Sequence, residues 1–134
     1  MSPAALADTV VVLHLGYVLF VILGLALIWL GVARRWQWVH RPLFRLTHLV
    51  CTLIVPLEAL AGAICPLTTW ERNLRLEAGQ RPEEISFMGR FARELLFYQA
   101  PEWVFTLCYV AFGLVVLVTF FRVPIRRARV APAP

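Results

Sequence analysis

Seven residues with ionisable, thiol or hydroxyl side chains are spaced so that they could form one polar site in an otherwise apolar chain. Glu58 is the most unusual, because it interrupts a run of apolar residues long enough for a membrane helix. A carboxyl group there costs at least a few kcal/mol unless it is protonated or partnered. We expect His14 to be that partner, so the chemistry would be proton exchange or small-ligand binding. The full set is His14, Tyr17, Glu58, Cys65, Glu71, Arg75 and Tyr109.

The spacing of these residues places them on helical stripes. Three apolar runs each repeat small or polar residues every three or four positions, which puts them on one helix face. Counted from the outer ends of the runs, His14, Tyr17, Glu58 and Tyr109 lie roughly 7–12 Å deep. Such stripes can simply join packed membrane helices, or they can form a functional site in the outer leaflet. Both interpretations remain open. The stripes are His14-Tyr17-Val21-Gly24-Ile28-Gly31, His48-Cys51-Val55-Glu58-Gly62-Cys65 and Glu102-Thr106-Tyr109-Gly113-Val116.

Composition indicates an integral membrane protein. Of the 134 residues, 60% are hydrophobic, and the mean hydropathy is +0.74. A soluble all-helical core would need polar faces that the first run lacks. We predict a single all-α domain over residues 1–122, a bundle with three transmembrane helices at about 9–33, 46–65 and 102–121.

Two shorter helices are predicted between the second and third spans, on the outer side. Thr68 and Glu71 form a capping-box pattern that would start a helix after Cys65-Pro66, and Gly79 would end it. Residues 83–98 have the pattern of an amphipathic helix lying on the membrane surface. Residues 123–134 are rich in Pro, Ala and Arg, and we expect a basic, disordered tail.

The charges set the expected topology. All thirteen basic residues are arginines, and the net charge is +5. Residues 34–45 contain four arginines and no acid, as do residues 122–134, whereas acids outnumber arginines between 66 and 102. The positive-inside rule therefore puts the N-terminus outside and the C-terminus in the cytoplasm. Because the arginines flank apolar spans, nucleic acid is not an expected partner.

Several functional classes lack the residues they need. The chain has no P-loop, dinucleotide-binding glycine pattern, zinc-protease motif or nucleophile elbow, so we expect no catalytic residue and no self-sufficient enzyme. His14 and His48 would lie roughly 18 Å apart along the membrane normal, too far to ligate one haem. We expect His40 and His48 to be interfacial polar residues at the cytoplasmic side.

The run Cys65-Pro66-Leu67-Thr68-x-x-Glu71, followed by Arg75 and preceded by Glu58 and Gly62, resembles a bacterial membrane family. That family is known as domain of unknown function 2784, and the resemblance covers roughly residues 6–120. His14 is similar to a histidine early in the family's first span. The resemblance implies a small protein of the bacterial inner membrane, and it implies no known activity.

Three functional hypotheses follow. The first is a non-enzymatic accessory or small-ligand-binding protein with an outer polar site, its partners being the lipid bilayer and another membrane protein or a second copy. The second is a redox or metal protein that binds haem, a quinone or copper through His14, Cys65 and His48. The third is one half of a proton-coupled transporter with Glu58 as proton carrier. The sequence does not name a cofactor or a metal.

Overall fold

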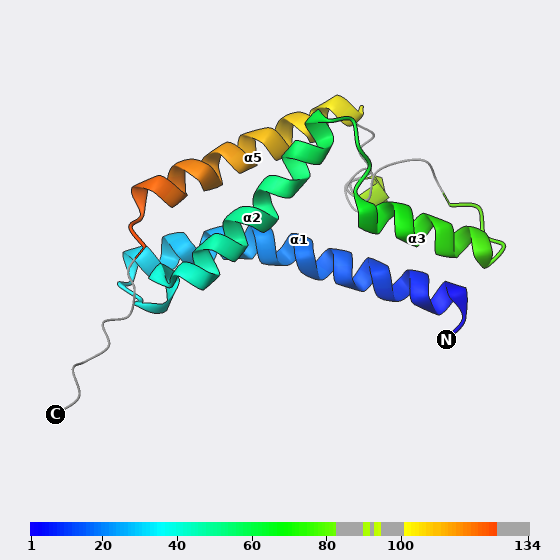
Figure 1. Ribbon diagram of the computed structural model, residues 1–134, viewed down its shortest axis with the longest axis horizontal. Helices are drawn as coiled ribbons and strands as arrows, with labels where there is room; N and C mark the ends of the chain where they lie inside the picture. The colour runs from blue at the N-terminus through cyan, green and yellow to red at the C-terminus, as the bar shows by residue number, and fades with distance from the viewer. Residues whose placement is uncertain (83–89, 92, 95–100, 126–134) are drawn as a thin grey trace.

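The computed structural model describes residues 1–82, 90–91, 93–94 and 101–125, and all regular structure within them is helical (Figure 1). Three helices are long and apolar enough to cross a membrane, which confirms the predicted all-α class. The elements are α1 (Pro3–Ala33), the 3₁₀ turn η1 (Trp38–His40), α2 (Pro42–Leu60), α3 (Pro66–Glu77) and α5 (Glu102–Arg122). The predicted surface helix at 83–98 and the tail beyond 125 lie almost entirely outside the described residues.

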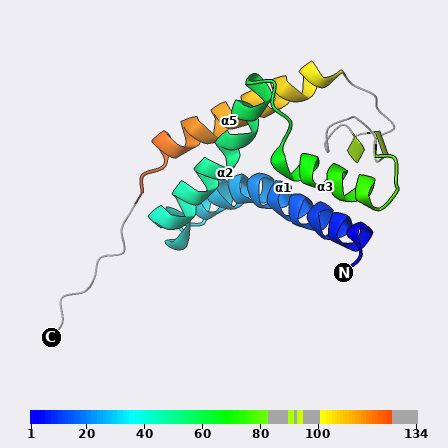
Figure 2. The same ribbon diagram turned by 45° about the vertical axis from the view of Figure 1, so that its right-hand side comes forward.

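The helices form two pairs that diverge from one end of the molecule. α3 lies along the first half of α1, and α5 lies along α2 (Figures 1 and 2). The pairs meet where α1 ends and α2 begins. We call this the basic end, because Arg34, Arg35, Arg41 and Arg122 lie there. The opposite end, where α3 lies, is called the cavity end.

α1 begins earlier than the predicted first span. Pro3 occupies its first turn, and the backbone N–H of Ala5 donates to Oγ of Ser2 at 3.3 Å, so Ser2 caps the helix. Its 31 residues extend about 46 Å, well beyond a hydrocarbon core of about 30 Å. α3 covers the additional turns through a cluster of Ala7, Val10 and Leu74. The helix after Cys65 is therefore part of the bundle.

α2 is displaced towards the N-terminus relative to the predicted second span. It begins at Pro42 and ends at Leu60, because Gly62 takes a left-handed backbone (φ +69°) and Ala63 N–H donates to the Glu58 carbonyl at 2.9 Å. Gly62 and Cys65 therefore do not continue the helical stripe predicted for this segment. Arg45, which precedes the predicted second span, lies in the first turns of α2.

The predicted capping box of α3 is wrong. The helix begins at Pro66 with Cys65 as its N-cap residue, and the Cys65 side chain makes no capping hydrogen bond. Glu71 therefore lies inside the helix, and its carboxylate is free to bind other partners. The predicted stop is found, since α3 ends at Glu77 and Gly79 has a φ of +73°.

The α1–η1 connection contains an uncommon backbone conformation. Arg35 has a φ of +58°, in the left-handed region where glycine usually ends a helix. For a residue with a Cβ this costs about 1 kcal/mol. The conformation is held by a hydrogen bond from Trp36 N–H to the Gly31 carbonyl at 2.7 Å.

Two glycines of the predicted stripes allow close contacts between helices. A methyl group on Gly24 would lie 2.4 Å from Cδ2 of His48, and one on Gly113 would lie 3.1 Å from Cγ of Pro56. α1 therefore approaches α2 at Gly24, and α2 approaches α5 at Pro56. The small residues act as contact positions, as expected for packed membrane helices.

Candidate functional site

A cavity of about 550 Å³ lies between the two diverging helix pairs, towards the cavity end. Its walls come from α1, α2, α3 and α5, with Arg90 added from the connection between α3 and α5. Most of the wall is apolar, and it includes Val18, Val21, Ile22, Val55 and Phe112. The cavity is therefore apolar, with ionisable groups at a few places.

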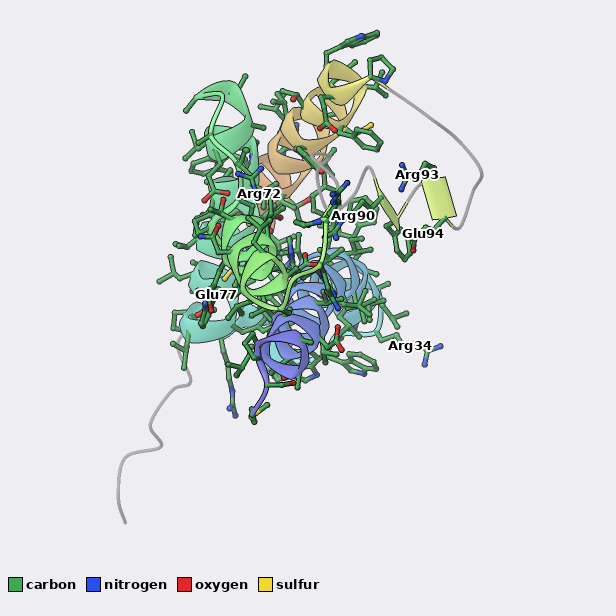
Figure 3. All side chains as sticks on the ribbon, turned by 90° about the vertical axis from the view of Figure 1, so that its right-hand side faces the viewer. Arg34, Arg72, Glu77, Arg90, Arg93 and Glu94 are labelled. Carbon is green, nitrogen blue, oxygen red and sulfur yellow. The ribbon has the colours of Figure 1, made fainter. Side chains whose placement is uncertain are left out.

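The structure places six of the seven predicted site residues in the wall of this cavity. Arg75 lies behind the wall, where it binds Glu71. Three residues that sequence reasoning missed also line the cavity, namely Arg72, Arg90 and Glu102. Figure 3 labels Arg72 and Arg90. The six are His14, Tyr17, Glu58, Cys65, Glu71 and Tyr109.

Glu58 lies near the end of α2. Its side chain is half-buried, and its Oε2 atom is buried without a hydrogen-bond partner among the described residues. Cys65 lies close enough to hydrogen-bond to the same carboxyl group. A buried polar atom without a partner is unfavourable, so Glu58 is the wall residue that a bound polar group would satisfy.

His14 and Glu58, which the sequence predicted to pair, both line the cavity. His14 is 7% exposed, and Glu71 of α3 and Arg90 lie close enough to act on it electrostatically. The histidine thus belongs to the α1–α3 side of the cavity, and Glu58 belongs to the α2 side. The two residues face the same cavity from different helix pairs.

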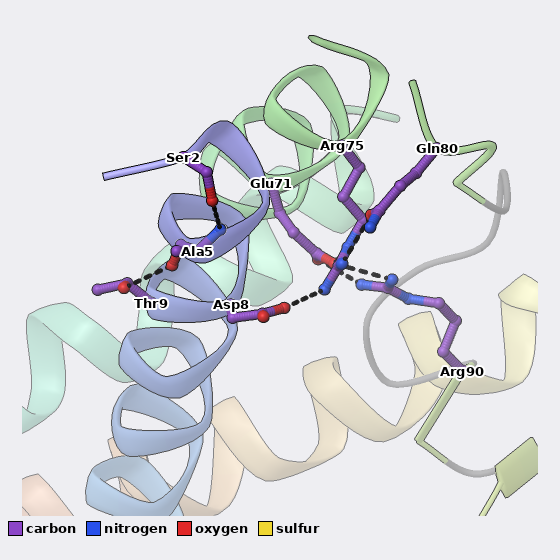
Figure 4. A network of polar contacts seen from close by, with 8 residues as sticks. All are labelled: Ser2, Ala5, Asp8, Thr9, Glu71, Arg75, Gln80 and Arg90. Atoms are coloured by element: carbon purple, nitrogen blue, oxygen red, sulfur yellow. Dashed lines mark hydrogen bonds and ion pairs between the residues drawn. The ribbon is translucent and has the colours of Figure 1, made fainter. Parts of the chain in front are cut away.

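Glu71 is the centre of the polar network at the cavity end (Figure 4). Its side chain is 2% exposed, and its Oε1 accepts hydrogen bonds from Arg75 Nε at 2.7 Å and from Arg90 Nη1 at 3.0 Å. Arg75 Nη2 also donates to Asp8 Oδ1 at 3.1 Å, which ties α3 to α1. The network therefore holds α1, α3 and the connection to α5 together.

Burial alone would raise the pKa of the Glu71 carboxyl group. The hydrogen bonds from Arg90 and Arg75 outweigh it and leave the pKa below the ordinary value of 4.5. Glu71 is therefore ionised at neutral pH, and it raises the pKa of Arg75. Glu71 and Arg75 lie four residues apart on α3 and form the ion pair that this spacing favours. In addition, Glu71 is buried, and Arg90 is its second partner.

The two tyrosines differ in their contacts. The hydroxyl group of Tyr17 donates to the backbone carbonyl of Cys51, which joins α1 to α2 at the base of the cavity. Tyr109 is on α5 and lines the cavity near Cys108 and Glu102. Tyr17 therefore has a packing role in addition to its place in the wall.

The residues considered for haem or metal binding are separated. His48 is 1% exposed, and its Nε2 lies 2.8 Å from the Val21 carbonyl, so it does not reach the cavity. This corrects the prediction that His48 is an interfacial polar residue. Cys65 is a free thiol at the start of α3. Within the described part of the chain, no three His, Cys, Asp or Glu residues are grouped as metal ligands would be.

The basic end contains a second polar network, which the sequence did not indicate. Arg45 is 2% exposed, and its Nη2 donates to the carbonyls of Thr119 (3.1 Å), Phe120 (3.3 Å) and Val123 (3.3 Å). These carbonyls belong to the C-terminal turn of α5, so Arg45 serves as its cap. Trp29 Nε1 donates to Thr119 Oγ1 at 3.1 Å, which brings α1 into the same network.

The described residues thus form a small helical bundle in which three helices that are long and apolar enough to cross a membrane surround a cavity with ionisable groups. The model of a family described as "Protein of Unknown function (DUF2784)" matches residues 4–125, so the chain belongs to this family. The family resemblance predicted from the Cys65–Glu71 run is thereby confirmed. Among curated proteins and solved structures no match was found.

Proposed function

We propose that this protein is a non-enzymatic membrane protein that binds one small, largely apolar ligand in the cavity between the two helix pairs. The observation that carries the proposal is a cavity of about 550 Å³ in whose wall Glu58 has a buried oxygen without a partner among the described residues. Small-molecule sites are mostly apolar, with a few polar groups that orient the ligand, and span roughly 300–1,000 Å³. Glu58 would orient the ligand through its polar group.

The proposed location is the inner membrane of a bacterium, with the cavity in the outer leaflet. Residues 34–45 and 122–134 contain eight arginines and no acid, which favours a cytoplasmic position for the basic end. The N-terminus, α3 and the Glu71 network would then face the outside. The ligand would enter from the outer leaflet or from the space beyond it.

The test is the small-molecule content of the purified protein. We expect mass spectrometry of an organic extract to find a molecule that is retained by the native chain and lost from Ala59→Trp, which fills the cavity. Ala26→Trp is the matched control, because Ala26 is exposed on α1 and does not line the cavity. Identical extracts from the native chain and both variants would contradict ligand binding in this cavity.

A redox role is the second candidate, because His14, Cys65 and Tyr109 line the same cavity. Haem would give a Soret absorption band in the purified protein, and a quinone would appear in the organic extract. A spectrum without a Soret band and an extract without quinone would argue against a haem or quinone role and favour the non-enzymatic ligand-binding protein. An accessory role predicts in addition that another membrane protein copurifies with the native chain.

A further inference from the structure

The basic end contains a second hollow, separate from the cavity. It measures about 410 Å³, and its walls are the end of α1, the η1 segment and the residues that follow α5. Three of its lining residues carry hydrogen-bond donors on their side chains, namely Arg35, Gln37 and Arg122, and His40 lines it as well. These residues come from separate segments of the chain, which the fold brings together.

The walls of this hollow are joined by hydrogen bonds. Nδ1 of His40 lies 2.9 Å from the Pro124 carbonyl, which connects η1 to the segment after α5. Arg45 binds the carbonyls of the last turn of α5 from the first turns of α2. The positions of Arg35 and Arg122 on opposite walls are therefore set by the packing of three helices.

None of the described residues that line this hollow carries a negative charge. Residues 9–57 and 103–134 contain neither Asp nor Glu. Every ion pair among the described residues involves Glu71 or Asp8, at the cavity end. Two guanidinium groups and their neighbouring donors therefore line a concave surface without an acidic partner, and such a surface favours a phosphate group.

The surrounding aromatic residues indicate where this phosphate group would come from. Trp29, Trp36 and Trp38 lie at the same end of the bundle, with Trp36 and Trp38 stacked at a centroid distance of 6.2 Å. Tryptophans are enriched at the headgroup level of a membrane, and basic hollows between helix ends at that level bind lipid headgroups. We infer that the hollow formed by Arg35, Gln37, His40 and Arg122 binds the headgroup phosphate of an acidic phospholipid.

The backbone of Arg35 supports a role for its side chain beyond charge. Glycine adopts the left-handed conformation found here without steric strain, and it is the usual residue at this point of a helix. An arginine at this position keeps a strained backbone, and Arg35 lines the hollow. Strain that persists in a native structure is concentrated at binding sites and active sites.

The simpler explanation is that these arginines only orient the protein in the membrane. On that explanation Arg34 and Arg35 are equivalent, because topology depends on the number of positive charges near the span. Headgroup binding distinguishes them, since Arg35 lines the hollow and Arg34 does not. Figure 3 shows the Arg34 side chain extending away from the helices.

The test uses the full chain, purified and exchanged into nanodiscs that contain phosphatidylcholine and phosphatidylglycerol. Native mass spectrometry after release from the nanodisc measures how many molecules of each lipid remain bound. The double variant Arg35→Gln/Arg122→Gln should retain about tenfold less phosphatidylglycerol, which corresponds to the loss of about 1.4 kcal/mol of binding free energy. The matched control Arg34→Gln/Arg41→Gln removes the same charge outside the hollow and should retain phosphatidylglycerol like the native chain.

The variant Arg35→Gly separates binding from folding. It should match or exceed the thermal stability of the native chain, because it removes backbone strain, and yet retain less phosphatidylglycerol. Equal losses of lipid in the two double variants would overturn the proposal in favour of a general charge effect. Displacement of phosphatidylglycerol by millimolar inorganic phosphate would overturn the lipid assignment and indicate a soluble anion.

Discussion

The basic end and the cavity end of this bundle both contain buried ionisable groups, but those groups have different partners. At the basic end, Arg45 binds three backbone carbonyls of α5 through Nη2, while its Nε atom has no partner among the described residues. Between this end and the cavity, His48 lies against the Val21 carbonyl. At the cavity end, Glu71 binds two arginine side chains, and Glu58 has an oxygen with no partner among the described residues. Hydrogen bonds to backbone carbonyls hold one helix in position against another. Side-chain partners and an unpaired carboxyl group, in contrast, can exchange their contacts when a ligand binds.

This difference indicates a division of roles along the bundle. The basic end holds the three spans together, and the cavity end holds a polar site open between them. Substitutions at the basic end should therefore reduce stability. Substitutions of cavity-wall residues outside the Glu71 network should leave stability nearly unchanged and alter binding. The following predictions test this division, beginning with the largest expected effect.

Arg45→Met should have the largest effect on folding. It leaves the carbonyls of Thr119, Phe120 and Val123 without their buried donor, so we expect a loss of about 3 kcal/mol of unfolding free energy. Thermal unfolding in detergent measures the change. Arg41→Met is the control, because Arg41 is exposed and its side chain caps no helix. Equal melting temperatures for the two variants would contradict a special role for Arg45.

Glu71→Gln should be the most destabilising substitution at the cavity end. Arg75 and Arg90 lose their shared carboxylate, but both are about one-fifth exposed and can be hydrated, so we expect a loss of about 2 kcal/mol. Combining it with Arg90→Met should cost less than the sum of the single changes, because the two side chains bind each other. Additive effects would show that the Glu71–Arg90 contact does not form.

The same network predicts a pH dependence. The folded-state pKa of Glu71 lies below its ordinary value of 4.5, so its stabilising contribution is complete above that value. The contribution is lost as the pH falls through the lower, folded-state pKa. The difference in melting temperature between the native chain and Glu71→Gln should therefore be constant near neutral pH and shrink in acid. A difference that persists unchanged in strong acid would argue against an ionised, buried Glu71.

Gly24→Ala should have a smaller effect, again at the inner contact between α1 and α2. The added methyl group would overlap the His48 ring, which is held by the Val21 carbonyl, and we expect a loss of about 1–2 kcal/mol. Gly16→Ala is the control on the same helix, because nothing lies within 4 Å of the added group, and it should stabilise by about 0.5 kcal/mol. Changes of opposite sign in the melting temperatures of the two variants would support the contact between Gly24 and His48.

Glu58→Leu should have the smallest effect on stability and the clearest effect on binding. Because the carboxyl group has an unsatisfied buried oxygen, its removal should change the unfolding free energy by less than about 1 kcal/mol, in the stabilising direction. The ligand recovered in organic extracts should be reduced. A destabilisation as large as that of Glu71→Gln would mean that Glu58 is a structural residue.

The sequence predicted the spans well, because hydropathy and arginine position depend on local composition. It also predicted which residues face the cavity from α1, α2 and α5, since a spacing of three and four residues defines one helix face. Its errors concern helix ends. The capping pattern at Thr68 suggested a later start than the one at Pro66, and no pattern indicated that Gly62 would end α2.

The partners of the buried charges could not be predicted for a different reason. Arg90 reaches Glu71 from 19 positions away, and Arg45 reaches α5 from 74 positions away. No periodic pattern connects such residues, because their proximity depends on how the helix pairs pack. From the sequence, the evident partner of Glu71 is Arg75, its neighbour on the same helix, and Arg45, which precedes the predicted second span, has no evident partner.

The polar network around Glu71 also constrains how this family can diverge. Asp8, Glu71, Arg75 and Arg90 together carry two negative and two positive charges, so they form an electrically neutral set. Loss of Glu71 alone leaves two arginines without their shared partner. Substitutions at positions 71 and 90 are therefore expected to occur together across family members, and this pair should give a covariation signal between α3 and the connection to α5.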